Sequence, residues 1–185
     1  MASDAIVGLT HLSGWLAVFA LIASLAMSLA SRFLRDQRAR LVAWRRIAGL
    51  VGFVSAVVHA SIALTGVLWP PSVDEALTVI ASVPYVRHGA LALALLTPLA
   101  LTSFPKLNAR VGLRTWETLH RGVYLAIALV LAHVLAGPSA DPRLVIAIAA
   151  IVIVLLLARL VPRSRVRETS DDEPRDQPPG LDATK

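Results

Sequence analysis

The stretch TWETLHRGVYLAIALVLAHVL, residues 115–135, decides the fold class of the chain. Most of its 21 residues are apolar, and a helix needs about 20 such residues to cross the hydrocarbon core of a membrane. A segment of this length in lipid forms a helix, because its backbone finds no water to bond with. The stretch also contains two imidazoles, His120 and His133. Ionisable side chains are costly inside a membrane and therefore indicate a function.

Four further apolar segments of similar length are present, over residues 9–34, 47–69, 85–104 and 144–161. Of the 185 residues, 56% are hydrophobic, which is typical of a multi-span membrane protein. The sequence therefore predicts an all-α integral membrane bundle with five transmembrane helices, in one domain over residues 9–162.

The two ends of the chain differ from this apolar domain. Residues 1–8 are expected to form a short outer N-terminus. The first apolar segment is interpreted as a retained span, since no basic stretch precedes it as in a cleavable signal peptide. Residues 163–185 combine acidic side chains with prolines and almost no apolar residues, which predicts a disordered cytoplasmic tail.

Basic residues gather in alternate connections between the spans. The first loop, the third loop and the segment after the fifth span carry Arg32, Arg35, Arg38, Arg40, Arg45, Arg46, Lys106, Arg110, Arg114, Arg163, Arg165 and Arg167. Loops rich in lysine and arginine stay in the cytoplasm. The sequence therefore predicts a multi-pass protein of the bacterial inner membrane, with its N-terminus outside and its C-terminus in the cytoplasm. The positive charges behind the net charge of +6 lie in these loops, at the ends of the apolar segments. We therefore expect membrane lipid, and not nucleic acid, as a partner of the chain.

Several kinds of chemistry are excluded by composition. The chain has no cysteine, so it forms no disulfide, iron–sulfur cluster or covalently attached c-type haem. No pair of carboxylates lies in a span, and we assign no catalytic residue. There is no internal repeat and no glycine-rich phosphate loop. Electrons from a nicotinamide cofactor would have to arrive through another protein.

His59 and His133 are predicted to lie at the same depth of the membrane. His59 follows Arg46 by 13 residues, which is roughly 20 Å along a helix. His133 lies near the outer end of another span that runs in the same direction. Two imidazoles facing each other from neighbouring helices are what a haem with two axial histidines requires. The alternative is a pair of unrelated histidines that only pack helices.

His120 precedes His133 by 13 residues and belongs to the inner part of the same span. It is either a ligand of a second haem, with an unusual partner or none, or an interfacial histidine near the lipid headgroups. A separation of 13 residues rotates a helix by about 220°, so His120 and His133 do not share a face.

Arg45, Arg46 and Gly49 are the remaining candidate residues, at the inner end of the second span. The arginines are expected to pair with a haem propionate or a flavin phosphate, or to act only as orientation signals. Gly49 lets the helix approach either a flat macrocycle or a neighbouring helix.

Several stretches of the chain resemble one membrane family. WRRIAG, residues 44–49, followed by His59, is similar to one haem-bearing helix of the ferric-reductase-like transmembrane domain. Residues 84–103 resemble the helix that follows it. The run from Trp116 through LHR and VY to His133 is similar to the second haem helix. The resemblance covers about residues 10–160. It applies in particular to the haem-binding membrane subunit of the bacterial periplasmic methionine-sulfoxide reductase system.

This resemblance implies a membrane b-type cytochrome with one or two haems b. Its donor would be a cytosolic flavin reductase or the quinone pool, and its acceptor a periplasmic reductase subunit. It further implies His59 and His133 as outer ligands, His120 as the inner histidine, and FMN or quinone as further cofactors. The chain would then be the electron-transfer subunit of an oxidoreductase system. The alternatives are a quinone-linked cytochrome anchor of another oxidoreductase, and a cofactor-free transporter or scaffold.

Overall fold

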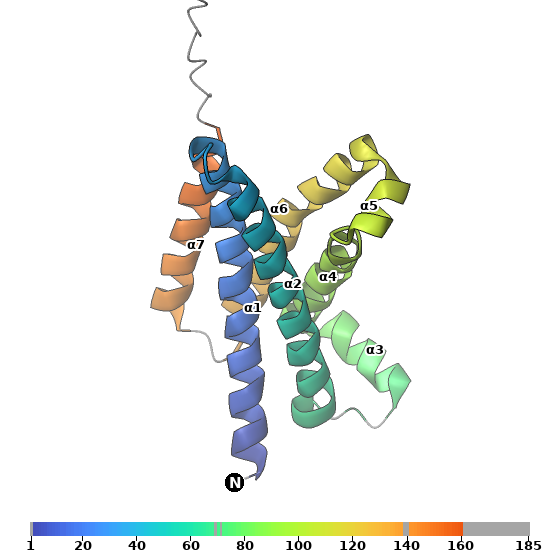
Figure 1. The fold of residues 1–185 in the computed structure, drawn as a ribbon. Helices are drawn as coiled ribbons and strands as arrows, with labels where there is room; N and C mark the ends of the chain where they lie inside the picture. Colours follow the sequence, from blue (N-terminus) through green and yellow to red (C-terminus); the bar gives the residue numbers. More distant parts are fainter. Residues whose placement is uncertain (1, 69, 71, 139–140, 161–185) are drawn as a thin grey trace, which may run out of the picture.

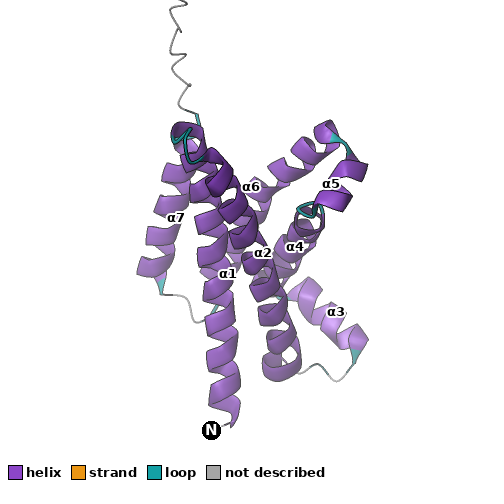
Figure 2. Cartoon of the chain, in the orientation of Figure 1, coloured by secondary structure: helices purple, strands orange, loops and turns teal. Residues whose placement is uncertain are grey.

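The computed structural model describes residues 2–68, 70, 72–138 and 141–160, and all regular structure in these residues is helical (Figure 2). The prediction of an all-α fold is thus confirmed. The elements are α1 Ala2–Phe33, α2 Arg38–Ile62, the π-helical turn η1 Ala63–Leu68, α3 Val73–Ser82, α4 Pro84–Leu101, α5 Pro105–Val111, α6 Leu113–Ala136 and α7 Pro142–Leu157. Helix α1 begins at Ala2 and therefore includes residues 2–8 of the segment expected to form a short outer N-terminus. The expected cytoplasmic tail, residues 163–185, lies outside the described residues.

The count of five transmembrane helices is not confirmed. Three segments are long and apolar enough to cross a membrane: Asp4–Phe33, Arg38–Leu68 and Arg114–Ala136. The third expected span, residues 85–104, corresponds to α4 alone. Helix α4 meets the preceding α3 at an angle of 102°, and the two together form a broken span or a re-entrant loop. The fifth corresponds to α7, which is apolar but shorter than the other spans. The number of spans by length and composition is therefore three, or four if the bent pair crosses.

Two short helices, α3 and α5, lie between the expected spans, where the sequence predicts loops. Ser72 caps α3, because its side chain accepts a hydrogen bond from the backbone N–H of Glu75 at 3.2 Å. A serine followed three residues later by glutamate is a known signal for a helix start. Pro105 begins α5, where a proline is favoured because its missing N–H has no partner in the first turn.

The bundle consists of two helix pairs and one flanking helix (Figure 1). The most extensive contacts join α1 to α2 and α4 to α6, and α2 also contacts α4. Helix α7 packs on α1 and α6. A buried cluster of Leu21, Leu96 and Ala126 joins the two pairs, and a second cluster of Leu25, Ile127 and Val152 ties α7 to α1 and α6. This packing fixes which faces of α2 and α6 meet.

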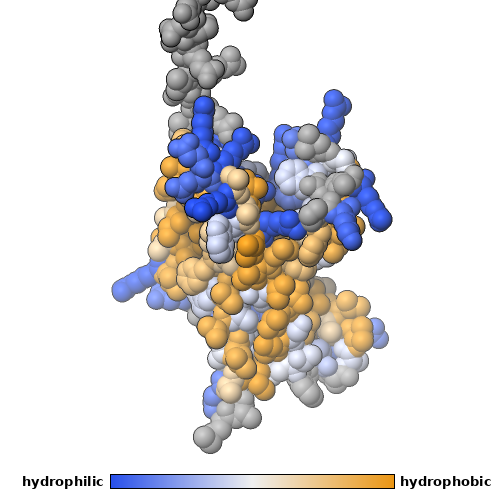
Figure 3. Space-filling view, viewed as in Figure 1, coloured by the Kyte–Doolittle hydropathy of each residue, from blue (hydrophilic) through white to orange (hydrophobic). Residues whose placement is uncertain are grey.

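The basic connections lie at one end of the bundle. The α1–α2 loop, α5 and the end of α7 are on the same side, while the N-terminus and α3 are on the other (Figure 1). The space-filling view has hydrophilic residues gathered at the first end and an apolar surface over the middle of the helices (Figure 3). Many large apolar side chains are exposed there, including Phe19, Val54 and Ile146. Such a surface is suited to lipid tails.

Candidate functional site

The structure brings His59 of α2 and His133 of α6 together. The centres of their rings are 5.8 Å apart, and the ring planes are nearly perpendicular, at 81°. Two imidazoles on opposite sides of one metal ion, with metal–nitrogen bonds of about 2 Å, have ring centres roughly 6 Å apart. The facing arrangement expected from the sequence is therefore present, while the role of the pair as iron ligands stays a prediction.

Backbone carbonyls orient both rings. The Nδ1 atom of His59 lies 2.8 Å from the carbonyl oxygen of Thr10, and that of His133 lies 2.6 Å from the carbonyl oxygen of Tyr85. A carbonyl oxygen only accepts hydrogen bonds, so each Nδ1 carries the proton and donates it. In a neutral imidazole the lone pair is then on Nε2, which is free to bind a metal. A hydrogen bond from the other ring nitrogen is the usual support of a metal-binding histidine.

A glycine on the neighbouring helix packs against each of the two imidazole rings. A Cβ atom placed on Gly14 would lie 2.9 Å from Nδ1 of His59, and one on Gly89 would lie 2.9 Å from Nδ1 of His133. Both distances are shorter than a carbon and a nitrogen normally approach, so only glycine leaves room for the rings where they are. Gly14 and Gly89 were not identified as site residues from the sequence.

The same arrangement thus occurs twice, although the sequence shows no internal repeat. In each half, a carbonyl and the glycine four residues after it hold a histidine on the partner helix. Gly14 precedes His59 by 45 residues, and Gly89 precedes His133 by 44. The spacing is nearly equal in the two halves, but it becomes recognisable only once the packed helices show which glycine contacts which ring.

The donor set is suited to a haem rather than to a bare metal ion. In the part of the chain that the structure describes, no group of three or more histidine, cysteine, aspartate or glutamate residues could hold a metal. Two imidazoles leave a tetrahedral zinc site incomplete. The same two side chains would be sufficient to hold the iron of a porphyrin, which brings its own four nitrogen ligands. The residues present therefore fit a haem held by two histidines.

His120 lies apart from this pair, toward the opposite end of α6. Its Nδ1 is 3.1 Å from the carbonyl oxygen of Trp116, one turn earlier on the same helix. The centres of the two rings are 4.1 Å apart, and their planes are tilted by 31°. The indole Nε1 of Trp116 is buried and has no hydrogen-bond partner among the described residues. The other four histidines belong to the opposite half of the bundle, so no imidazole faces His120.

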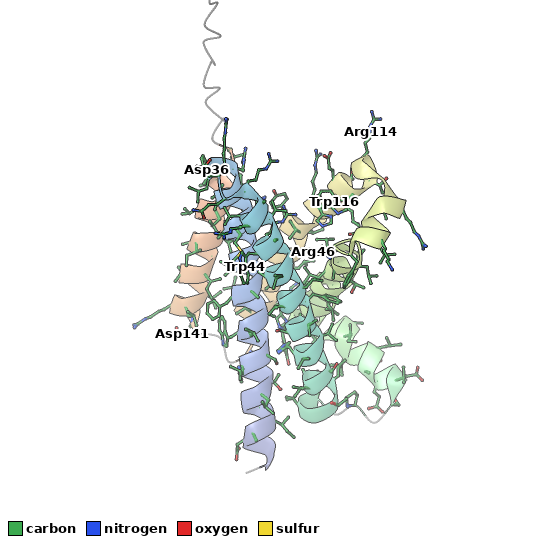
Figure 4. All side chains as sticks on the ribbon, in the orientation of Figure 1. Asp36, Trp44, Arg46, Arg114, Trp116 and Asp141 are labelled. Carbon is green, nitrogen blue, oxygen red and sulfur yellow. The ribbon has the colours of Figure 1, made fainter. Side chains whose placement is uncertain are left out.

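The structure separates the two candidate arginines. Arg45 is half-buried, and its Nη1 lies 3.5 Å from the hydroxyl of Ser28 on α1. Arg46 is exposed and is labelled in Figure 4, where Arg114 and Trp116 mark the start of α6. Gly49 faces Ser24 of α1, with 3.5 Å between the serine oxygen and a Cβ at that position. This contact favours helix packing as the role of Gly49.

A pair of residues that we had not singled out, Tyr124 and Arg159, lies at the same end of the bundle. Nη1 of Arg159 donates a hydrogen bond to the Tyr124 hydroxyl, and its Nη2 donates to the carbonyl of Leu25 at 3.3 Å. Arg159 lies two residues after the end of α7, and a basic residue at the end of an apolar segment was the signal available in the sequence.

The sequence of the chain is similar to those of known proteins. A family model described as the ferric reductase like transmembrane component matches residues 13–131. The chain belongs to this ferric-reductase-like family. The matched region includes Gly14, His59, Gly89 and His120 and ends two residues before His133.

Individual relatives confirm the resemblance seen in the sequence. The chain is 34% identical over 148 residues to the protein-methionine-sulfoxide reductase heme-binding subunit MsrQ of Caulobacter vibrioides, covering 76% of this chain and 65% of that protein. The identity to MsrQ of Brucella ovis is 36% over 135 residues, covering 69% and 58%. It is 34% over 149 residues to the magnetosome protein MamZ of Paramagnetospirillum magneticum, covering 80% and 22%.

The chain thus spans less than two thirds of the length of each of these relatives. No solved structure matches it.

Proposed function

We propose that this protein is a membrane b-type cytochrome that passes electrons across the bacterial inner membrane. The single observation that carries the proposal is the pair His59 and His133, whose ring centres are 5.8 Å apart and whose Nδ1 atoms each bond to a carbonyl, which leaves the lone pair on Nε2. The name of the MsrQ relatives, a heme-binding subunit of a reductase, supports the same cofactor. The acceptor is then a periplasmic reductase, in the first instance one that acts on methionine sulfoxide.

When bound, the haem supplies an iron that cycles between the ferric and ferrous states. The chain's own part is to hold both imidazoles in one tautomer and one orientation, so that little rearrangement accompanies each electron transfer. The apolar helices around the pair exclude water, and lowering the local polarity in this way tunes the potential of the iron. His120 is kept as a candidate ligand of a second haem, which the ratio of haem to protein would reveal.

The visible spectrum of the purified protein tests the proposed function. A haem held by two histidines gives an intense Soret band and a sharp α-band on reduction with dithionite. A protein that stays colourless after expression with added haem precursor would instead be a cofactor-free transporter or scaffold, with His59 and His133 as packing or proton-relay groups. A coloured protein reduced by quinol alone would favour the quinone-linked cytochrome.

Entry of electrons is proposed at the end of the bundle that carries the arginines, from a cytosolic flavin reductase or from quinol. We expect Arg45→Ala to slow haem reduction by such a donor about tenfold, because charge-assisted contacts to phosphate or propionate are worth about 1.5–3 kcal/mol. Arg46→Ala is expected to have a smaller effect, since Arg46 is exposed and Arg45 is half-buried beside Ser28.

Stopped-flow reduction in nanodiscs, with a flavin reductase and a nicotinamide cofactor, measures both rates. Dithionite serves as the control, because it should reduce both variants and the unaltered protein to the same extent. Unchanged rates in Arg45→Ala and in the double variant would leave these arginines as orientation signals only.

The proposed orientation places the C-terminus in the cytoplasm. The basic connections lie at one end of the bundle, and positively charged loops remain inside. Alkaline phosphatase fused after Lys185 is therefore expected to be inactive, and the same enzyme fused after Gly137, in the connection between α6 and α7, is expected to be active. The reverse pattern would invert the orientation and with it the proposed direction of electron flow.

A further inference from the structure

A pocket of about 600 Å³ opens beside the end of α7. Its lining combines two arginines, a tyrosine and three leucines: Arg32, Tyr124, Leu156, Leu157, Arg159 and Leu160. Three segments that are distant in the sequence build it, namely the last turn of α1, the middle of α6 and the end of α7. It lies at the basic end of the bundle and apart from His59 and His133.

The polar side of this pocket is positively charged and held in place. Nη1 of Arg32 donates to the carbonyl of Arg159 at 2.7 Å, while Arg159 donates to Tyr124 and to the carbonyl of Leu25. Within the described residues, none of these hydrogen bonds goes to a carboxylate, so neither positive charge is neutralised there. The Nε atom of Arg159 is buried and has no hydrogen-bond partner in that part of the chain. The described residues therefore do not fill the hydrogen-bonding capacity of the Arg159 side chain.

The other side of the pocket belongs to the lipid-facing surface. Leu157 is 57% exposed and Leu160 is 76% exposed. Leucines on the outside of a membrane helix contact acyl chains, and basic pockets between helices on the cytoplasmic side bind anionic lipid headgroups. The ligand that satisfies both sides at once carries a phosphate and an acyl chain.

We propose that this pocket binds one anionic phospholipid, with its phosphate on Arg32 and Arg159 and an acyl chain along Leu156, Leu157 and Leu160. The bound lipid then links α7 to α1 and α6 through contacts that the protein alone does not make. The site is separate from the histidine pair, so the inference does not depend on the proposed electron transfer.

The test uses the whole chain of 185 residues, purified and stripped of lipid in detergent. Phosphatidylglycerol added in mixed micelles is expected to raise the thermal unfolding midpoint and to remain bound as one molecule in native mass spectrometry. Phosphatidylcholine, which has no net charge, is expected to do neither at the same concentration. This comparison in the unaltered protein needs no variant to fold.

Variants then locate the site on α7. Arg159→Gln is expected to weaken phosphatidylglycerol binding about tenfold or more, since it removes charge-assisted hydrogen bonds. Arg143→Gln is the matched control, because it removes the same charge from the opposite end of the same helix. Arg32→Gln, on α1, should weaken binding as Arg159→Gln does.

Three outcomes would overturn the proposal. Equal stabilisation by phosphatidylcholine would mean that only the acyl chain is recognised. Equal stabilisation by inorganic phosphate would mean that a free anion, and not a lipid, occupies the site. Equal loss of binding in Arg143→Gln and Arg159→Gln would mean that overall charge, and not this pocket, attracts the lipid.

Discussion

Replacing either His59 or His133 by alanine is expected to remove the low-spin haem almost completely. Both imidazoles are proposed to hold the haem, and their ring centres are 5.8 Å apart. No third histidine, cysteine or carboxylate among the described residues completes a group with them that could hold a metal ion. Loss of one ligand leaves an iron with an open position and a cavity where the ring had been. The pyridine haemochrome content of membranes normalised to protein, together with the position of the Soret band, measures the loss.

His11→Ala provides the control for these two variants. His11 is an exposed histidine on α1, one residue after Thr10, whose carbonyl accepts the hydrogen bond from His59. Its replacement should leave both haem content and spectrum unchanged. The assignment of the ligand pair is wrong if His59→Ala and His133→Ala both keep the haem content and spectrum of the unaltered protein.

The proximity of His59 and His133 could be predicted from the sequence because it depends only on the depth of each residue in the membrane. Counting residues from the basic end of each span gives height along a helix, since the rise per residue is constant. The resemblance of residues 44–59 and 116–133 to haem-bearing helices pointed to the same two histidines. Both arguments use information that is local to one segment.

The number of spans could not be obtained in the same way. Apolar length alone does not distinguish a straight helix from one that bends, and the residues around Val83 allow a turn of 102° between α3 and α4. The backbone of Val83 is extended, and Pro84 directly follows it. The residue before a proline is biased away from the helical region, and this was the local signal for the break.

The contacts that orient the two histidines also could not be predicted from the sequence. Which carbonyl lies opposite His59, and which glycine lies under it, depends on how α1 rotates against α2. That rotation is set by side chains distributed along both helices, such as Leu21 against Gly52. The same holds for Arg159, whose partners Tyr124 and Leu25 come from two other helices. Interhelical register, unlike depth, is a property of the packed bundle.

Gly14→Ala and Gly89→Ala are expected to disturb the haem almost as strongly as loss of a ligand. The added methyl group would lie 2.9 Å from Nδ1 and 3.1 Å from Cε1 of the facing imidazole in both cases. The ring must move away, and its hydrogen bond to the carbonyl of Thr10 or Tyr85 is then lengthened or lost. Loss of such a supporting hydrogen bond typically lowers metal affinity by about 10- to 100-fold.

The midpoint potential distinguishes this effect from a general weakening of the fold. A hydrogen bond from Nδ1 makes the imidazole a stronger donor to the metal, and a stronger donor favours ferric iron. The haem that remains in Gly14→Ala or Gly89→Ala should therefore have a higher potential than that of the unaltered protein. Redox titration of the α-band measures the potential, and haemochrome assays measure the content.

Gly8→Ala is the matched control on the same helix as Gly14. A Cβ at Gly8 would have no heavy atom within 4 Å, and alanine is the better helix former at an exposed position. Gly122→Ala serves in the same way for α6, where the nearest atom, of Leu99, would be 3.9 Å away. If Gly14→Ala and Gly89→Ala behave like these controls in both content and potential, the glycines only pack helices. If they differ as expected, two equivalent pairs of carbonyl and glycine hold the two imidazoles from opposite sides.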